Sequence, residues 1–266
     1  MEARPLIAKV NDIDIAYNRW GEGNSKRIML VPGWTCVKEV WTDIASMLAK
    51  EDFDVVAMDL RGSGDSSKPA GDYTLTVLAN DLHELAKQLD WTGGFTMLGH
   101  SMGGAVLMDY TFRYPETLTH IIPANAGLGM PRPAITSRIL WAFILGTFKK
   151  NPEKMLKIII PHFFMVPISK EKHDWFLSMA LKTDTSAGIS QMQHCLAWNS
   201  WADLSNIKIP TMVVSAELEP RATRKISQRI HEMIPNSTLV TLRKTGHMHF
   251  MTHPEVLFRA IVDFVQ

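Results

Sequence analysis

The stretch Gly99-His100-Ser101-Met102-Gly103 constrains the fold of this chain more than any other. It lies between an apolar run, Phe95 to Leu98, that suits a buried strand, and a run with helical spacing, Ala105 to Met108. A serine between two glycines at a strand-to-helix turn forms a nucleophile elbow. The tight turn leaves no room for side chains at the glycines, and the helix N-terminus favours a developing negative charge. We therefore predict that Ser101 is a nucleophile, whereas the simpler interpretation is a glycine-rich connection.

Strand and helix patterns alternate on both sides of this stretch. Two strands, 7–10 and 13–20, are predicted to form a hairpin, and further buried strands are predicted at 28–31, 54–58, 120–123, 211–215 and 237–242. Helical periodicity is found around 41–48, 76–89, 221–233 and 254–265. This order predicts an α/β fold with a mostly parallel sheet, helices on both faces, and chemistry at the carboxyl ends of the strands.

The alternation stops between residues 128 and 206, where aromatic and aliphatic residues recur without strand patterns. We predict three or four helices that form a cap, entered near Pro131 and Pro133, on a core made of residues 1–127 and 207–266. Most of the apolar residues in the cap only pack against one another. Because a cap on a sheet encloses a gap that a ligand can fill, Trp141, Phe164 and Trp198 are candidates for contact with an apolar substrate.

Charge and composition exclude several functions. The 28 lysines and arginines against 27 acidic residues leave a net charge of +1, so there is no electrostatic case for nucleic acid. No window reaches the roughly 18 apolar residues of a membrane helix, and the chain starts with no apolar stretch of signal length. Cys36 and Cys195 fit no metal or disulfide spacing. We expect a cytoplasmic protein without metal, cofactor or membrane span; a homodimer stays open.

A serine hydroxyl needs a base to take its proton. Among ten histidines, His247 follows a glycine just beyond the last predicted strand, at the sheet edge that carries Ser101. His249 is its local rival, and we favour His247. The acid that orients the imidazole is Glu219 or Glu217, both of which follow the strand 211–215. Glu219 is favoured because Glu217 suits a solvated loop.

Two backbone amides would stabilise an oxyanion. Met102, the residue after the serine, offers one, and Trp34, in the loop after the strand 28–31, offers the other. The Trp34 indole would then line the site, although it also suits the core. His100 and Asn125, beside the serine and after the strand 120–123, are further candidates for substrate contact. Asn125 occupies the other place from which an acid could come.

With these residues, the chain resembles the α/β-hydrolase superfamily. The similar segments fall in the family's order: Pro32-Gly33-Trp34, Asp59 to Gly64, Gly99 to Gly104, Pro210 to Glu219 and Gly246 to His249. The resemblance implies an eight-stranded sheet, the triad Ser101-Glu219-His247, and the amides of Trp34 and Met102 at the oxyanion. Two positions depart from the common pattern: Pro32 stands where many members have histidine, and Glu219 where most have aspartate.

These features favour a serine hydrolase that cleaves a carboxylic ester or related acyl compound with an apolar body. At these two positions the sequence is also similar to a branch of cofactor-independent dioxygenases of the same fold. Those enzymes open hydroxylated N-heteroaromatic rings with a histidine base. That branch takes its acid from the strand end where this chain has Asn125, which counts against it. A third interpretation, a non-catalytic binding protein with a capped cavity, is disfavoured by the intact set of catalytic residues.

Overall fold

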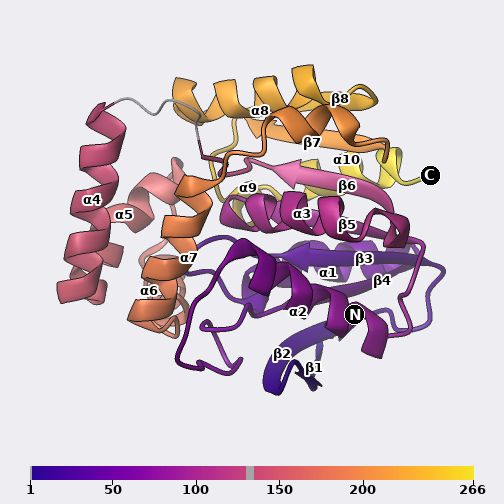
Figure 1. Ribbon diagram of the computed structural model, residues 1–266, viewed down its shortest axis with the longest axis horizontal. Coiled ribbons are helices and arrows are strands. Elements are labelled where there is room, and N and C mark those ends of the chain that lie inside the picture. Colours follow the sequence, from indigo (N-terminus) through magenta and orange to yellow (C-terminus); the bar gives the residue numbers. More distant parts are fainter. Residues whose placement is uncertain (1, 130–134) are drawn as a thin grey trace.

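The computed structural model describes residues 2–129 and 135–266. An open eight-stranded sheet runs through the molecule, with helices on both of its faces (Figure 1). The strands are β1 (Arg4–Val10), β2 (Ile13–Trp20), β3 (Lys26–Val31), β4 (Phe53–Met58), β5 (Phe95–His100), β6 (Leu118–Ala124), β7 (Thr211–Ala216) and β8 (Ser237–Leu242).

The strand order is β1-β2-β4-β3-β5-β6-β7-β8. The pairs β1–β2 and β2–β4 are antiparallel, and every pair from β4 to β8 is parallel. The predicted mostly parallel sheet is therefore confirmed. Because the carboxyl ends of parallel strands meet at one edge, the residues that follow β3, β5, β6, β7 and β8 are brought together there.

The first two strands form the predicted hairpin. Asn11 and Asp12 both have positive φ, 46° and 62°, and Val10 pairs with Ile13 across the turn. Asparagine and aspartate tolerate this left-handed backbone better than other side chains, which is why a two-residue connection suffices here. The structure starts the first strand at Arg4, three residues before the predicted start.

Helices cover the sheet on two sides. The helices α2 (Leu75–Gln88), α3 (Met102–Arg113) and α8 (Arg221–Met233) lie on one face, and α1 (Thr42–Leu48) and α10 (Pro254–Phe264) pack together on the other (Figure 1). A short 3₁₀ turn, Lys38–Trp41, leads into α1. Among the helices of the described residues, none combines the length and apolarity that crossing a membrane requires.

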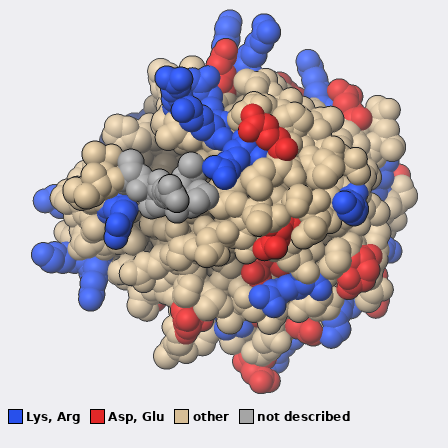
Figure 2. All heavy atoms as spheres, turned by 45° about the horizontal axis from the view of Figure 1, so that its top comes forward, with Lys and Arg blue, Asp and Glu red and all other residues tan. Residues whose placement is uncertain are grey.

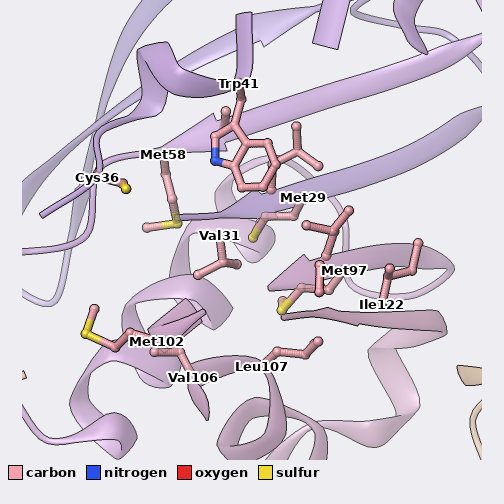
Figure 3. Packing of buried hydrophobic residues seen from close by; sticks show 14 of the residues in the cluster. Met29, Val31, Cys36, Trp41, Met58, Met97, Met102, Val106, Leu107 and Ile122 are labelled. Carbon is pink, nitrogen blue, oxygen red and sulfur yellow. The ribbon is translucent and has the colours of Figure 1, made fainter. Parts of the chain in front are cut away.

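The central strands are buried because both of their faces are covered, as their unbroken apolar runs predict. Methionines from three neighbouring strands, Met58, Met29 and Met97, meet in the core with Trp41 on one side (Figure 3). On the other side Val106 and Leu107 of α3 pack under the sheet. This core anchors the strand ends that carry the site.

Among the described residues, four α-helices lie between β6 and β7, the upper limit of the predicted number. They are α4 (Ile135–Lys150), α5 (Pro152–Phe164), α6 (Lys170–Ala180) and α7 (Thr185–Ala197), and we call them the inserted helices. In Figure 1 they lie beyond one end of the strands. The predicted entry at Pro131 and Pro133 lies outside the described residues. That the inserted helices form a cap separate from the core stays a prediction.

A buried ion pair joins the loop after β3 to the loop after β4. Lys38 Nζ lies 2.9 Å from Asp59 Oδ2 and 2.7 Å from Asp65 Oδ2. The Asp59 side chain is fully buried, and it also accepts hydrogen bonds from the amides of Lys38 and Asp65. On the face shown in Figure 2, basic and acidic side chains both occur, among wide uncharged areas.

Candidate active site

Ser101 lies at a sharp turn between β5 and α3. Its backbone has φ 54° and ψ −120°, a conformation that costs energy for any residue with a side chain. Three hydrogen bonds hold this backbone: Ser101 N donates to Ala124 O at 3.0 Å, and Ser101 O accepts from Gly104 N and Gly127 N, both at 2.8 Å. The serine side chain is half-buried at the start of α3.

Gly99 and Gly103 are required as glycines because main-chain atoms of neighbouring segments lie too close to them for a side chain. A Cβ on Gly103 would lie 2.5 Å from Val31 O and 2.6 Å from Pro32 O, both immovable main-chain atoms at the end of β3. A side chain on Gly99 would meet the carbonyl of Gly103. Strand and helix therefore pass at backbone distance, as predicted from the sequence.

Gly103→Ala is expected to lower the free energy of unfolding by about 3 kcal/mol, because overpacking against rigid neighbours forces the backbone to shift. Gly146→Ala is the matched control, since its Cβ would meet no atom within 4 Å and it lies inside α4. That variant should gain roughly 0.5–1 kcal/mol from helix propensity. Urea unfolding of both variants measures the difference, and equal stabilities would contradict the close approach.

Glu219 and His247 are in contact. Glu219 Oε1 accepts a hydrogen bond from His247 Nδ1, and the carboxylate is buried while the imidazole is partly exposed. Arg224, near the start of α8, donates from Nε to the carbonyl of Glu219 at 3.1 Å. Glu217, the alternative acid, accepts instead from the amide of Lys244 at 2.7 Å. Glu219 is therefore the carboxylate that faces the imidazole.

The third contact of a triad is not made. In the described part of the chain, the Ser101 hydroxyl has no hydrogen-bond partner. His247 nevertheless lies beside the serine, because its carbonyl accepts a hydrogen bond at 2.9 Å from His100, the residue before Ser101. Catalytic hydrogen bonds are often long before a substrate binds.

The loop after β3 also packs against the serine. A Cβ on Gly33 would lie 3.1 Å from the Cβ of Ser101, so the next peptide, which carries the Trp34 amide, is close to the nucleophile. Within residues 2–129 and 135–266, neither the Trp34 amide nor the Met102 amide donates to another group. Both amides therefore lack a protein partner within these ranges, and their role at an oxyanion stays a prediction.

The Trp34 side chain extends from this loop to the inserted helices. Its Nε1 donates to Gly188 O of α7 at 2.7 Å, and its ring lies 5.0 Å from Phe148 and 6.2 Å from Trp141, both on α4. The indole is buried. It joins the core to the inserted helices, and it brings Trp141, a predicted substrate contact, to the same region.

Phe164 and Trp198, the other aromatic residues predicted to contact substrate, are buried against other aromatic side chains. Phe164 is fully buried against Phe176, with ring centroids 5.3 Å apart, and Trp198 is buried against Trp201. The neighbouring Phe163 is half-buried, and its ring centroid lies 5.9 Å from that of His247, with the two rings tilted by 36°. Sequence reasoning missed Phe163, because two adjacent phenylalanines on one helix give no sign of which one faces the site.

His100, Asn125 and His249 lie beneath the His247 loop and are almost fully buried. Asn125 Oδ1 accepts from Ala216 N at 2.8 Å, which ties the end of β6 to the end of β7. The substrate contacts predicted for His100 and Asn125 stay predictions, and the structure gives both side chains partners within the protein. His249, the rival base, begins the short helix α9 (His249–Thr252), which the sequence did not indicate.

The two cysteines are free and buried. Burial raises the pKa of both Cys36 and Cys195 to about 12, so neither thiol ionises at neutral pH. In the described ranges, no group of three histidine, cysteine, aspartate or glutamate side chains is arranged to hold a metal ion. A surface depression of about 470 Å³ around Lys172, Lys244 and His253 includes none of the candidate catalytic residues.

We expect the protein to lose stability in mild acid. Burial, and then the neighbouring His247, lower the pKa of His249 to about 3 and that of His100 well below its ordinary 6.5. Below pH 6.5 the unfolded chain therefore binds protons that the folded protein excludes. Each histidine removes about 1.4 kcal/mol per pH unit until its folded pKa is reached.

Urea unfolding between pH 7 and 4.5 measures this slope. His249→Asn, which removes one titrating group, should reduce the slope of unfolding free energy against pH by about 1.4 kcal/mol per pH unit. An unchanged slope in that variant would contradict the depressed pKa of His249.

An open, mostly parallel sheet with a serine elbow after a central strand, and a paired carboxylate and histidine after later strands, defines an α/β-hydrolase architecture. The chain belongs to the alpha/beta hydrolase family, whose model matches residues 28–260. The superfamily resemblance inferred from the sequence is confirmed.

Relatives cover nearly the whole chain at low identity. The AB hydrolase superfamily protein YisY of Bacillus subtilis is 24% identical over 252 residues, 91% of this chain and 92% of its own. The esterase EaEST from Exiguobacterium antarcticum superposes with a TM-score of 0.89 at 22% identity, covering 98% of this chain and 99% of that one. A bromoperoxidase from Bacillus anthracis gives the same TM-score, identity and coverage.

Proposed function

We propose that this protein is a serine hydrolase that cleaves a carboxylic ester or related acyl compound with an apolar body. The proposal rests on the hydrogen bond between Glu219 and His247. The His247 carbonyl in turn accepts a hydrogen bond from His100, the residue before Ser101 in the elbow. Family membership supports a hydrolase at a coarse level, and the similarity to an esterase agrees with it.

In the proposed reaction, Ser101 Oγ attacks the substrate carbonyl while His247 Nε2 takes the hydroxyl proton. Glu219 holds the imidazole through Nδ1 and stabilises its charged form. The amides of Trp34 and Met102 bind the oxyanion. His247 then protonates the leaving alcohol, and a water molecule that it activates releases the acyl group and restores Ser101.

An apolar substrate body is proposed because aromatic side chains surround the site. Trp34, Trp141 and Phe148 stand together on one side, and Phe163 lies against His247. We propose that residues 128–206 act as a cap over the core of residues 1–127 and 207–266, with the Trp34–Gly188 hydrogen bond as one of its attachments.

The position of Asn125 supports hydrolysis over cofactor-independent oxygenation. Its side chain approaches the backbone carbonyl of His247 at 3.4 Å, whereas the carboxylate at the imidazole is Glu219. Asn125, which stands where the dioxygenase branch has its acid, therefore does not act as the acid in the proposed reaction.

A fluorophosphonate probe followed by mass spectrometry tests the proposal, together with a panel of p-nitrophenyl esters of increasing chain length. Covalent labelling of Ser101 and serine-dependent hydrolysis are expected. Oxygen consumption with a 3-hydroxy-4-quinolone that survives loss of Ser101 would identify the oxygenase instead. A ligand that raises thermal stability, with neither labelling nor turnover, would identify a binding protein.

A further inference from the structure

The backbone carbonyl of His247 is surrounded by buried side-chain nitrogens. His100 Nε2 lies 2.9 Å from this oxygen, His249 Nδ1 lies 3.2 Å from it, and Asn125 Nδ2 lies 3.4 Å from it. A carbonyl oxygen has two lone pairs, so the two histidines are the main donors and the longer asparagine contact is secondary. All three side chains are at most 1% exposed.

Protonation states follow from this geometry. Both histidines are neutral because burial lowers their pKa values, so each carries one N–H. The proton lies on the nitrogen that faces the carbonyl, Nε2 in His100 and Nδ1 in His249. In the described part of the chain the opposite nitrogens, His100 Nδ1 and His249 Nε2, have no hydrogen-bond partner, which agrees with unprotonated lone pairs there.

Asn125 orients the same assembly. Its Oδ1 is used by the amide of Ala216, so its Nδ2 points towards His247 and His249. Because His249 Nδ1 carries a proton in this arrangement, the Asn125 amide cannot donate to it and donates to the His247 carbonyl instead. The three donors come from the ends of β5 and β6 and from α9, which are three separate parts of the chain.

We propose that His100, Asn125 and His249 form a carbonyl clamp, a set of donors that positions His247 for catalysis by holding its main-chain oxygen. This inference rests on the proposed serine hydrolase function. Glu219 holds the imidazole through its ring, and the clamp holds the peptide that bears it. Together they set the position of His247 Nε2 relative to Ser101, and a shift of about 1 Å there can cost 10²-fold in rate.

Paired substitutions separate donation from packing. His100→Gln places an amide N–H near the position of Nε2, and His249→Asn places one near Nδ1, whereas leucine at either position fills the space without a donor. The leucine variants are expected to lower kcat by about 10- to 100-fold. KM should stay within twofold, since all three clamp side chains are buried beneath the His247 loop, and the rate of phosphonate labelling should fall with kcat. Glutamine and asparagine should restore kcat to within about threefold of wild type.

Leucine variants that keep the wild-type kcat would overturn the clamp and leave the hydrolase intact. Equal losses in the leucine and amide variants would also overturn it, because packing would then explain both. Failure of the proposed function gives a different result, namely wild-type turnover that persists in Ser101→Ala.

The tautomers test the clamp without any dependence on activity or on variant folding. In ¹⁵N-histidine-labelled wild-type protein, long-range proton–nitrogen spectra should show neutral His100 protonated at Nε2 and neutral His249 protonated at Nδ1. A His100 signal from the Nδ1–H tautomer would exclude donation to the carbonyl and overturn the proposal.

Discussion

Ser101→Ala is expected to lower kcat for ester hydrolysis by roughly 10⁵- to 10⁶-fold and to abolish phosphonate labelling. Loss of a serine nucleophile removes the whole covalent pathway, and the residual rate reflects the oxyanion donors and binding alone. KM should change little if the serine contributes only to the transition state. The measurement is turnover of the best p-nitrophenyl ester, with labelling followed by intact-protein mass.

Ser101→Ala should fold normally, so a loss of activity can be attributed to the missing hydroxyl. The Ser101 side chain forms no capping hydrogen bond to α3, so its removal leaves the helix start unchanged. Ser205→Ala, an exposed serine far along the chain in the turn before β7, is a matched control and should retain full activity. Retention of most activity in Ser101→Ala, with loss in His247→Ala, would refute the serine hydrolase and favour base chemistry without acylation.

Lys38→Met is expected to cost about 3–5 kcal/mol of unfolding free energy, the largest stability effect we predict. The ammonium is the main countercharge of Asp59, and both side chains are nearly inaccessible to water. Removing one member of a buried pair leaves the other charge uncompensated. Two backbone amides still donate to Asp59, which favours the lower end of the range. Urea unfolding at pH 7 measures the loss.

Asp65→Asn provides the comparison, because it removes the most exposed carboxylate partner of the same lysine, together with the exposed ion pair of Asp65 with Lys182. About half of the Asp65 side chain is exposed, so the effect should stay below about 1 kcal/mol. The double variant Lys38→Met/Asp59→Asn should recover part of the loss, since the buried Asp59 charge is removed together with its countercharge. A Lys38→Met protein as stable as wild type would show that the two amides alone are enough for Asp59.

The periodic parts of the fold were predictable from the sequence. The bounds of α8 and β8 agree with the predicted 221–233 and 237–242, because each shows a clear apolar pattern ended by turn residues. The short helix at His249 was not predicted, since four residues carry too little periodicity. The sequence favoured Glu219 only because Glu217 suits a solvated loop, and the structure gives the physical reason: the Glu217 carboxylate accepts a hydrogen bond from the Lys244 amide.

The carbonyl clamp and the Lys38–Asp59 pair were beyond sequence reasoning for a different reason. His100 and Asn125 were considered as substrate contacts because they follow strands at the reactive edge. Within the protein, their hydrogen-bond partners lie 147 and 91 residues away, His247 O for the first and Ala216 N for the second. Nothing local marks such a partner, because a single sequence records which residues are near one another only along the chain.

These long separations bear on how the protein folds. Trp34 bonds to a carbonyl 154 residues later, and His100 reaches 147 residues ahead. Contacts between distant segments form late and slowly, because the chain entropy of closing large loops must be lost first. A refolding chain therefore has no working site until β8 has joined the sheet and the His247 loop lies over β5. Recovery of hydrolysis should follow the last tertiary step rather than the first appearance of helix.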